Sequence, residues 1–296
     1  MTFKSGFISI VGRTNVGKST LLNNILNQKI AITSNKAQTT RTKIQGVLST
    51  DEYQMIFIDT PGIHKPKSKL GENMVNVAKK SVVDVEAICF ITDISQPIKA
   101  GDKFILEQLK SANAPVILVA NKIDLTDPAQ VKQRIDEFKS LFNFADILAL
   151  SALQQANVDS LPKLLLKYID EGPKFYPEDM ITDQPERVIV QELLREKILE
   201  LTRDEIPHGI AIDIIRFTEN SKGTVEISAN IYVERESHKG IVIGKSGKLL
   251  KEIGKRARLD IEDFLQTKVF LEVWVKVKKG WRDKHNAIKD FGLLGE

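Results

Sequence analysis

Eight consecutive residues near the start of the chain have the types and spacing of a phosphate-binding loop. They match the pattern G-x-x-x-x-G-K-[ST] and comprise Gly12, Arg13, Thr14, Asn15, Val16, Gly17, Lys18 and Ser19. The backbone N–H groups of such a loop surround an anion, and glycines let that backbone approach it closely. Lys18 is expected to reach the β- and γ-phosphates of a nucleotide, and the Ser19 hydroxyl is expected to ligate Mg²⁺.

The segments on both sides of this loop predict the elements that must position it. The apolar run 7–11 indicates a buried strand, and the apolar residues of 20–26 recur at helical spacing. A helix that begins at the loop adds its positive N-terminal dipole to the anion site. Thr20, in the first turn of that helix, completes the set of nucleotide-contacting residues expected in this segment.

A second polar segment follows the apolar run 55–58. Asp59 is expected to hold Mg²⁺ through water, as the aspartate of phosphoryl-transfer sites does. Gly62 can turn its backbone N–H toward a γ-phosphate, because its Cα carries no side chain. This segment therefore predicts a second part of the same nucleotide site.

A third segment, with the sequence Asn-Lys-Ile-Asp, follows the run 115–120 and would select the purine. Guanine carries adjacent N1–H and N2–H₂ donors, and the Asp124 carboxylate can accept both. Adenine would leave that carboxylate unpaired, so the segment predicts guanine specificity. The stem of Lys122 is expected to lie along the base, and Asn121 is expected to tie this segment to the phosphate-binding loop.

A further apolar run, 146–150, ends at Ser151 and Ala152, where the Ala152 N–H could donate to guanine O6. Since every motif follows an apolar run, all are expected at the carboxyl ends of parallel strands, where open α/β sheets bind ligands. The combination resembles the translation-factor-like class of GTPases over residues 1 to about 170. The resemblance implies an α/β domain with a mostly parallel, doubly wound sheet that binds GTP or GDP with Mg²⁺.

The polar stretch 32–41 resembles the switch I loop of that class. In the class, a threonine here ligates Mg²⁺ only when the γ-phosphate is present; Thr40 is the expected ligand and Thr39 the alternative. Ras-like proteins carry a glutamine directly after the position of Gly62, where it orients the attacking water. Ile63 stands there in this chain and cannot do so, which predicts slow intrinsic hydrolysis.

Asn15 indicates another source of catalysis. In related GTPases an asparagine at this place in the loop helps to hold K⁺ against the β- and γ-phosphates, where the ion stabilises transition-state charge. We therefore hypothesise that K⁺ stimulates hydrolysis here. The expected catalytic set comprises Lys18, Asn15, Thr40 and Gly62. His64 is a poor candidate for a general base, since it lies in a segment rich in lysine and proline.

The composition changes after this domain. The stretch 170–179 holds two prolines, one glycine and four acids, and indicates a linker. The expected organisation is a GTP-binding domain at 1–172, a linker at 173–187 and a second domain at 188–296. The patterns of the second domain follow the order helix, strand, strand, helix, helix, strand, which resembles a type II KH domain of the α+β class.

The segment 244–247 matches the G-x-x-G loop with which KH domains clamp unpaired nucleotides. Residues 239–258 around it carry a net charge of +6, against +4 for the whole chain, and this concentration indicates a nucleic-acid footprint. The expected RNA contacts are Gly244, Lys245, Ser246, Gly247, Lys248, Lys251, Lys255 and Arg256. No aromatic residue interrupts the basic run, and Trp274, within the strand-like run 269–277, is expected in the core.

A GTPase domain followed by a type II KH domain resembles the Era family of bacterial GTPases over nearly the whole chain. Membership implies a factor in small ribosomal subunit maturation that binds the single-stranded 3′ end of the small-subunit ribosomal RNA through its KH domain. It also implies that GTP favours RNA binding and that hydrolysis favours release. Thr14 stands where many relatives have proline, and little consequence is expected.

Length and cysteine content limit the number of domains and the classes of protein that fit this chain. The 296 residues fit two domains, and the one cysteine, Cys89, lies in an apolar run and excludes a disulfide framework. The absence of a signal peptide and of an apolar run of membrane-spanning length predicts a cytoplasmic protein, by default a monomer. Two alternatives stay open: an RNA-binding scaffold with GTP as a structural ligand, and a cell-cycle GTPase whose basic run makes peripheral contact with anionic membrane lipid.

Overall fold

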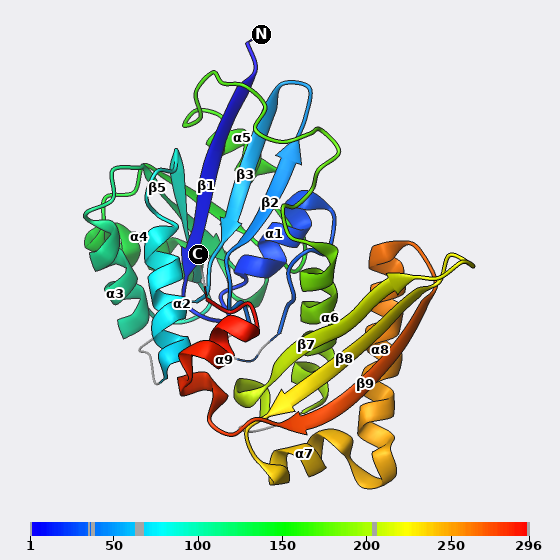
Figure 1. The fold of residues 1–296 in the computed structure, drawn as a ribbon. Helices are drawn as coiled ribbons and strands as arrows, with labels where there is room; N and C mark the ends of the chain where they lie inside the picture. Colours follow the sequence, from blue (N-terminus) through cyan, green and yellow to red (C-terminus); the bar gives the residue numbers. More distant parts are fainter. Residues whose placement is uncertain (1, 35, 37–38, 63–67, 203–205, 295–296) are drawn as a thin grey trace.

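The computed structural model describes residues 2–34, 36, 39–62, 68–202 and 206–294. Figure 1 shows two sheets, each covered by helices. The first sheet and its helices comprise β1 (Lys4–Gly12), α1 (Lys18–Leu26), β2 (Ile44–Ser49), β3 (Tyr53–Asp59), α2 (Lys69–Lys80), β4 (Ala87–Asp93), α3 (Ala100–Leu109), β5 (Val116–Asn121), η1 (Ile123–Leu125), α4 (Pro128–Leu141), β6 (Asp146–Leu150) and α5 (Ser160–Leu165). The second sheet and its helices comprise α6 (Glu186–Leu201), η2 (Ile206–Gly209), β7 (Ala211–Glu219), β8 (Val225–Val233), α7 (Glu236–Ile243), η3 (Lys245–Gly247), α8 (Lys248–Leu265), β9 (Val269–Val277), η4 (Trp281–Asp283) and α9 (His285–Asp290).

The first sheet has six strands in the order β2-β3-β1-β4-β5-β6. β2 pairs antiparallel with β3, whereas the other neighbouring strands pair parallel. Parallel strands are covered on both faces, so they need apolar residues at successive positions, as the fully buried strand β5 has. The mostly parallel sheet predicted from the sequence is confirmed.

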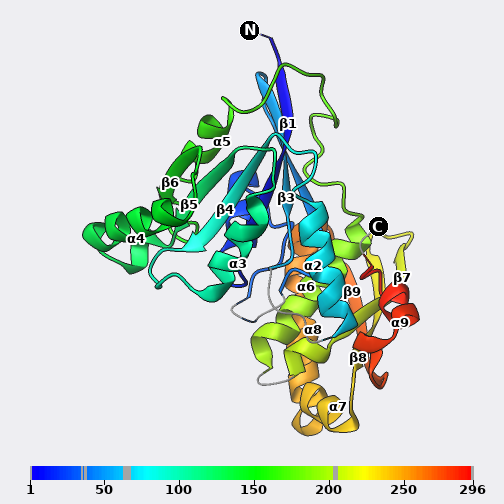
Figure 2. The same cartoon turned by 90° about the vertical axis from the view of Figure 1, so that its left-hand side faces the viewer.

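Helices cover both faces of this sheet, as a doubly wound fold requires. α1 and α5 pack on one face through residues such as Leu21 and Leu161. α2, α3 and α4 pack on the other face through residues such as Ile105 and Phe138. Figure 2 shows α2 and α3 on the near side of the sheet. The carboxyl ends of the strands between these two layers are left free to carry the loops with the predicted motifs.

The second sheet has three strands in the order β7-β8-β9, with β7 antiparallel and β9 parallel to β8. Residues of α6, α7 and α8, among them Leu194, Val242 and Ile253, pack against it in one apolar cluster. Because α6 precedes the first strand, the order of elements confirms the type II KH arrangement. Within the ranges that the structure describes, no helix has both the length and the apolar character needed to cross a bilayer.

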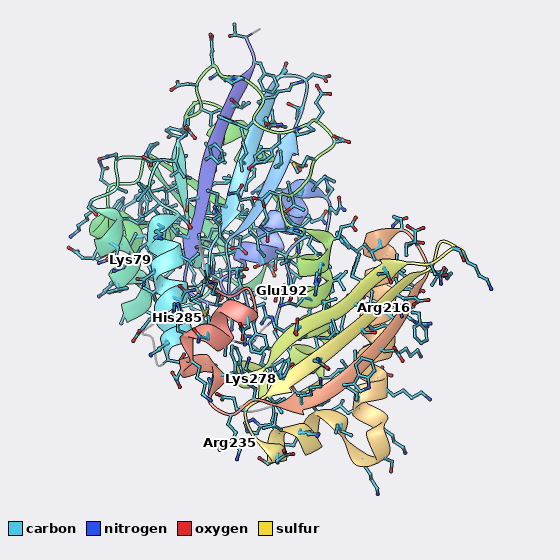
Figure 3. All side chains as sticks on the ribbon, in the orientation of Figure 1. Lys79, Glu192, Arg216, Arg235, Lys278 and His285 are labelled. Atoms are coloured by element: carbon cyan, nitrogen blue, oxygen red, sulfur yellow. The ribbon has the colours of Figure 1, made fainter. Side chains whose placement is uncertain are left out.

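Trp274 lies on the open face of the second sheet, so the predicted core position is wrong. About half of its surface is exposed (46%). Successive strand residues point to opposite faces, and since Val273 and Val275 pack in the core cluster, Trp274 between them must face outward. The same face carries Arg216, labelled in Figure 3, whose guanidinium pairs with Glu226 at 2.6 Å.

An apolar cluster joins the two domains beside α2. Trp281 is fully buried there and packs with Leu70 and Met74 of α2 and with Phe291 after α9. The indole N–H of Trp281 donates to the carbonyl of Gly209 at 2.9 Å, so the one polar atom of the buried ring is satisfied. The helix that follows the second polar motif of the first domain is thereby anchored to the KH domain.

The segment between the domains runs along the first domain. The amide oxygen of Gln54 accepts from the backbone N–H groups of Phe175 and Tyr176, at 2.7 and 3.0 Å. The Thr182 hydroxyl donates to the Gln45 carbonyl at 2.6 Å. These bonds fix the direction in which the chain enters α6.

Cys89 provides a test of this core. It is fully buried in β4, and burial raises the pKa of its thiol to about 12. Because the thiolate is the reactive form, only about one thiol in ten thousand is reactive at pH 8. We expect a thiol reagent to label the folded protein at least about a hundredfold more slowly than the protein unfolded in guanidinium chloride. The chain has one cysteine, so the label reports this site alone, and equal rates would contradict the buried position.

Candidate nucleotide and RNA sites

The phosphate-binding loop connects β1 to α1. Gly17 has a φ of +101°, and an added Cβ would lie 2.3 Å from Nδ2 of Asn121. The position therefore requires glycine both for its backbone conformation and for the close approach of another loop. Lys18 is buried at the start of α1, and its ammonium donates to the carbonyl of Arg13 at 2.9 Å. The lysine thus folds back over the loop on which phosphates would lie.

The residues predicted around the phosphates fall into two groups. Those that line the pocket in front of the loop are Thr14, Asn15, Gly17, Lys18, Ser19, Thr20, Thr40 and Gly62. The side chains of Arg13 and Val16 point elsewhere, since Arg13 pairs with Asp102 of α3 at 2.8 Å and Val16 packs in the core. Together with Gly12, which ends β1, these two residues can reach a nucleotide only through their backbones.

Three oxygen-bearing side chains meet where Mg²⁺ is predicted. The Ser19 hydroxyl lies 2.7 Å from Oδ2 of Asp59 and 2.9 Å from the Thr40 hydroxyl, which itself lies 3.2 Å from Oδ2. The second oxygen of Asp59, Oδ1, is buried without a hydrogen-bond partner among the described residues. Hard oxygen donors around one unpaired carboxylate oxygen fit Mg²⁺. Thr39 is not part of this group, because its hydroxyl donates to the Lys36 carbonyl at 2.7 Å.

Burial dominates the electrostatics of this group. It raises the pKa of Asp59, against the opposing effects of Lys18 and of the Ser19 and Thr40 hydroxyls. It lowers the pKa of Lys18, against the attraction of Asp59. A metal ion beside Asp59 and phosphates beside Lys18 would favour the charged forms that burial disfavours.

Asn121 connects the base-selecting segment to the phosphate-binding loop. Its Nδ2 donates to the carbonyl of Val16 at 2.7 Å, and its Oδ1 accepts from the N–H groups of Lys122 and Ala152, both at 2.8 Å. The Ala152 N–H, predicted to donate to guanine O6, is thus engaged by Asn121 in this structure. Ser151 is fully buried, and its hydroxyl accepts from the N–H of Gln154 at 3.0 Å, so its side chain shapes the loop from behind.

Asp93 is a site residue that the sequence analysis missed. It ends β4, and its carboxylate accepts from the Lys122 ammonium at 2.8 Å. Burial opposes the charge of Asp93, but the bonds from Lys122 and Ser95 outweigh it and hold the pKa below its usual value. Lys122 also donates to the Asn15 carbonyl at 3.0 Å, which draws the base and phosphate loops together. The signal was available, because Asp93 follows an apolar run like the other motifs.

The base-side cleft is built by both domains. It has a volume of about 680 Å³ and is lined by Asn121, Lys122 and Asp124 of the first domain. Leu199 and Glu200, at the end of α6, line it from the KH side. Nothing in the local sequence of α6 indicates this role, because it depends on how the second domain packs.

The backbone at Gly62 approaches the phosphate-binding loop closely. An added Cβ would lie 2.6 Å from Cγ2 of Thr14 and 2.8 Å from its backbone N and Cα. Glycine is therefore required at this position by its neighbour. Ile63 and His64, on which the predictions of slow hydrolysis and of a poor general base rest, lie outside the described residues.

The G-x-x-G loop joins α7 to α8 through three residues with positive φ. Gly244, Ser246 and Gly247 have φ values of 73°, 53° and 75°. An added Cβ at Gly244 would lie 2.6 Å from Cβ of Leu249, whereas at Gly247 it would meet nothing within 4 Å. Gly244 is thus required for packing, while the space beside Gly247 is open to a ligand.

A groove of about 630 Å³ lies beside this loop, between α8 and β9. Of the predicted RNA contacts, Gly247, Lys251 and Lys255 line it, and Arg258 and Phe270 join them. Lys245, Ser246 and Lys248 belong to the loop and the first turn of α8 but do not line the groove. Arg256 turns to Glu252, which it contacts at 2.6 Å. The helical spacing of Lys251, Lys255 and Arg258 places one basic stripe along one wall of the groove.

Comparison with known proteins agrees with the assignment of both domains. A family profile described as 50S ribosome-binding GTPase matches residues 7–122, and a KH domain profile matches residues 205–282. GTPase Era of Clostridium botulinum is 54% identical over 290 residues, which are 98% of this chain and 98% of that protein. This chain belongs to the Era family of GTPases. GTPase Era of Clostridium kluyveri is 55% identical over 289 residues, with 98% and 99% of the two chains covered.

Two solved structures of Era share the whole fold of this family member. A variant of Aquifex aeolicus Era bound to GDP and AlF4⁻ is 44% identical, with a TM-score of 0.95 over 98% of this chain and 99% of the other. Era in complex with MgGDPNP and nucleotides 1506–1542 of 16S ribosomal RNA is 45% identical, with the same TM-score and coverage. A match of this quality over both domains means that their relative arrangement is shared as well.

The close approach at Gly62 yields a test. In Gly62→Ala the added methyl group must displace either Thr14 or its own backbone, and small displacements of groups around reacting atoms cost large factors in rate. We expect GTP turnover, measured by phosphate release, to fall about tenfold or more while GDP affinity changes less than about threefold. Gly254→Ala is the matched control, because its methyl group meets only Val273 at an ordinary 3.8 Å. Normal turnover in Gly62→Ala would show that the contact is unimportant.

Proposed function

We propose that this Era family GTPase is a switch in which the GTP state controls binding of the 3′ region of small-subunit ribosomal RNA, and that it acts in maturation of the small ribosomal subunit. The observation that carries the proposal is the position of switch I. Its residues touch the predicted Mg²⁺ group on one side and the KH domain on the other. A change at the γ-phosphate would therefore alter contacts with the RNA-binding domain.

The contacts of switch I with the KH domain are made by consecutive residues. Thr40 joins the predicted Mg²⁺ group, while the carbonyl of Thr39 accepts from Arg195 of α6. The guanidinium of Arg41 donates to the Ile210 carbonyl at 2.5 Å and lies 5.8 Å from the centre of the Trp281 ring. A backbone displacement of Thr40 by several ångströms would disturb both of these contacts, since the three residues are adjacent in the chain.

Because Arg41 is buried, its charge depends on the contacts that its guanidinium makes with the KH domain. Burial lowers the pKa of Arg41 to about 9, with a further contribution from neighbouring Arg195 and an opposing one from Glu192. The guanidinium is still charged at neutral pH, and a buried charge needs its partners in place. Ile32, at the start of switch I, is also buried in the core cluster of the KH domain. Switch I is thus part of the interdomain packing.

The nucleotide residues take the roles that their geometry supports. In the proposed complex Lys18 meets the β- and γ-phosphates, and the loop residues Gly12 to Thr20 and the Gly62 N–H surround them. Ser19, Thr40 and Asp59 hold Mg²⁺, directly or through water, and the ion neutralises phosphate charge. Asp124 receives the two guanine donors, and Lys122 lies along the base. Because Ile63 cannot orient the attacking water, we propose that intrinsic hydrolysis is slow.

The RNA site is supported by the groove and by the comparison structure. The open space at Gly247 and the basic stripe on α8 suit a clamp on the backbone of unpaired nucleotides. The Era structure that contains GDPNP and nucleotides 1506–1542 of 16S ribosomal RNA has the same domain arrangement. The arrangement seen here therefore corresponds to one that accommodates such an RNA. The cytoplasmic location, the monomeric state and the peripheral membrane contact stay predictions from the sequence.

The first test is binding of a labelled RNA with the sequence of nucleotides 1506–1542, with the protein loaded with GDP or with GDPNP. We expect RNA binding to be about fivefold tighter or more in the GDPNP state, which is the lower end of common allosteric coupling. Gly247→Asp should weaken RNA binding about tenfold, because its carboxylate would occupy the space expected for phosphate.

Gly247 is a better test position than Gly244, where the clash with Leu249 would disturb the fold. The matched control is Gly292→Asp, which also replaces a glycine of positive φ with nothing within 4 Å and lies beyond α9. Equal binding in both nucleotide states would instead favour an RNA-binding scaffold with GTP as a structural ligand.

We also propose that K⁺ takes part in hydrolysis. Asn15 lines the phosphate pocket with a φ of 65°, held by Lys122 through its carbonyl. A cation placed beside the β- and γ-phosphates would stabilise the charge that develops there. We expect GTP turnover to be about tenfold faster in KCl than in NaCl, and the difference to disappear in Asn15→Ala. Equal turnover of the unaltered protein in the two salts would remove K⁺ from the mechanism.

A further inference from the structure

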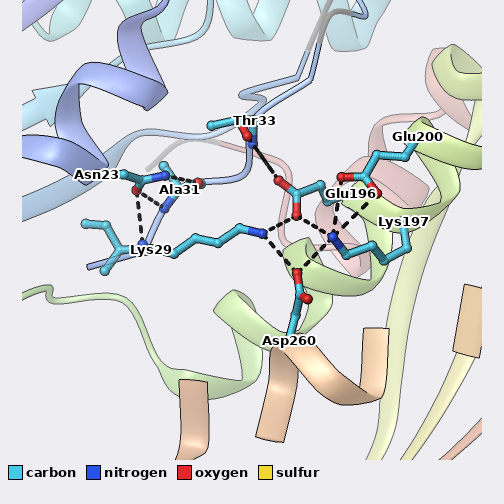
Figure 4. Close-up of polar contacts among 9 residues, drawn as sticks. Asn23, Lys29, Ala31, Thr33, Glu196, Lys197, Glu200 and Asp260 are labelled. Carbon is cyan, nitrogen blue, oxygen red and sulfur yellow. Dashed lines mark hydrogen bonds and ion pairs between the residues drawn. The ribbon is translucent and has the colours of Figure 1, made fainter. Parts of the chain in front are cut away.

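Two lysines and two carboxylates form a closed ring of alternating charge between the domains (Figure 4). Nζ of Lys29 lies 2.5 Å from Oε2 of Glu196 and 3.0 Å from Oδ2 of Asp260. Nζ of Lys197 lies 3.3 Å from the same oxygen of Glu196 and 2.8 Å from the same oxygen of Asp260. Each charge therefore has at least two neighbours of opposite sign, and Lys197 has a third in Glu200 at 3.3 Å.

The four members come from three separate elements. Lys29 belongs to the first domain, in the loop after α1, and this loop is fixed by Asn23, whose Oδ1 accepts from the N–H groups of Ile30 and Ala31. Glu196 and Lys197 lie on α6, and Asp260 lies on α8. The ring thus joins the GTPase domain, the first helix of the KH domain and the helix that follows the G-x-x-G loop.

Glu196 also belongs to a second set of contacts. Its other oxygen, Oε1, accepts from the backbone N–H of Thr33 at 2.8 Å and lies 3.4 Å from the Thr33 hydroxyl. Thr33 is part of switch I and lines the phosphate pocket. One buried carboxylate therefore holds switch I with one oxygen and the ring with the other, as Figure 4 shows.

Two members of the ring are withdrawn from water and two are partly solvated. The side chains of Glu196 and Lys197 are 1% and 10% exposed, whereas those of Lys29 and Asp260 are 41% and 30% exposed. Burial alone would lower the pKa of Lys197, but Asp260, Glu196 and Glu200 together raise it to about 12. Burial would raise the pKa of Asp260, but Lys197 and Lys29 hold it below its usual value. When one of these charges is displaced, its neighbours lose the attraction that offsets their burial.

α8 carries this connection toward the RNA groove. The helix begins at Lys248, directly after the G-x-x-G loop, and Asp260 lies twelve residues further, or about 18 Å along a rigid helix. Lys251 and Lys255, which line the groove, lie between these two positions. Fixing Asp260 therefore fixes the direction of the helix that presents the basic stripe.

We propose that this ring couples switch I to the RNA-binding helix, with Glu196 and Asp260 as its positioning residues. When switch I is ordered on the γ-phosphate, Thr33 holds Glu196, and the ring holds α8 in the orientation that binds RNA. When switch I rearranges, Glu196 loses Thr33 and the ring loses its fixed geometry. This inference rests on the proposed control of RNA binding by the GTP state and specifies the residues that transmit it.

The test measures the ratio of RNA affinities in the GDPNP and GDP states for the unaltered protein, Asp260→Asn, Glu196→Gln and the double variant. Both substitutions keep the shape of the side chain and remove its charge. We expect each to reduce the ratio about threefold or more, and the double variant to reduce it little further, since both act on one ring. GTP turnover of Asp260→Asn without RNA should stay within about twofold, because Asp260 does not line the nucleotide site.

Asp263→Asn is the matched control. It removes the same charge from the same helix at an exposed position that has no ion pair among the described residues. Its affinity ratio should equal that of the unaltered protein. If Asp260→Asn kept the affinity ratio of the unaltered protein, or if Asp263→Asn lost as much of it as Asp260→Asn, the role of the ring would be overturned. The proposed function would not be affected by either result. Equal RNA affinities in the two states of the unaltered protein would overturn the proposed function, and the ring's role with it.

Discussion

The adjacency of Thr39, Thr40 and Arg41 is the constraint on which the rest of this structure depends. One of these residues places its hydroxyl beside Asp59 and Ser19, while the other two are bonded to the KH domain. A peptide chain cannot move one residue by several ångströms and leave both neighbours where they were. The covalent geometry of switch I therefore transmits a backbone movement of Thr40 to the domain interface.

The same constraint explains why polar groups are buried at this interface. The guanidinium of Arg41 and the side chain of Arg195 lie almost completely out of water. Each donates to a backbone carbonyl of the opposite domain, and Arg195 is also paired with Glu192 at 2.5 Å. Because a buried charge without partners is costly, these residues stabilise one relative position of the domains and strongly disfavour neighbouring ones. Apolar contacts such as that of Ile32 add packing, but they fix the relative orientation of the two domains less closely because they are not directional.

The parts of the site that could be predicted from the sequence are those whose chemistry is local. A phosphate-binding loop needs two glycines, a lysine and a hydroxyl within eight residues, so Gly12 to Ser19 could be assigned without a structure. The parallel order of the strands followed from the repeated succession of apolar run and polar motif. The outward position of Trp274 could have been inferred from the alternation of the strand, because Glu272 and Lys276, two residues away on either side, share its face. Glu196 and Asp260 gave no signal, since their partner Lys29 lies more than 160 residues away in the chain.

The net stability of the four-charge ring is expected to be small, and that is consistent with a role in coupling. Burying Glu196 and Lys197 costs several kcal/mol for each ion, and the attraction within the ring roughly offsets this, while Lys29 and Asp260 keep part of their hydration. A contact with a large net contribution would hold the domains together in every nucleotide state. A ring whose attraction only balances its desolvation is favourable when every partner is in place and unfavourable when one leaves. In the proposed switch Glu196 would lose Thr33 as a partner when switch I rearranges, and the balance of the ring would then be set from the nucleotide site.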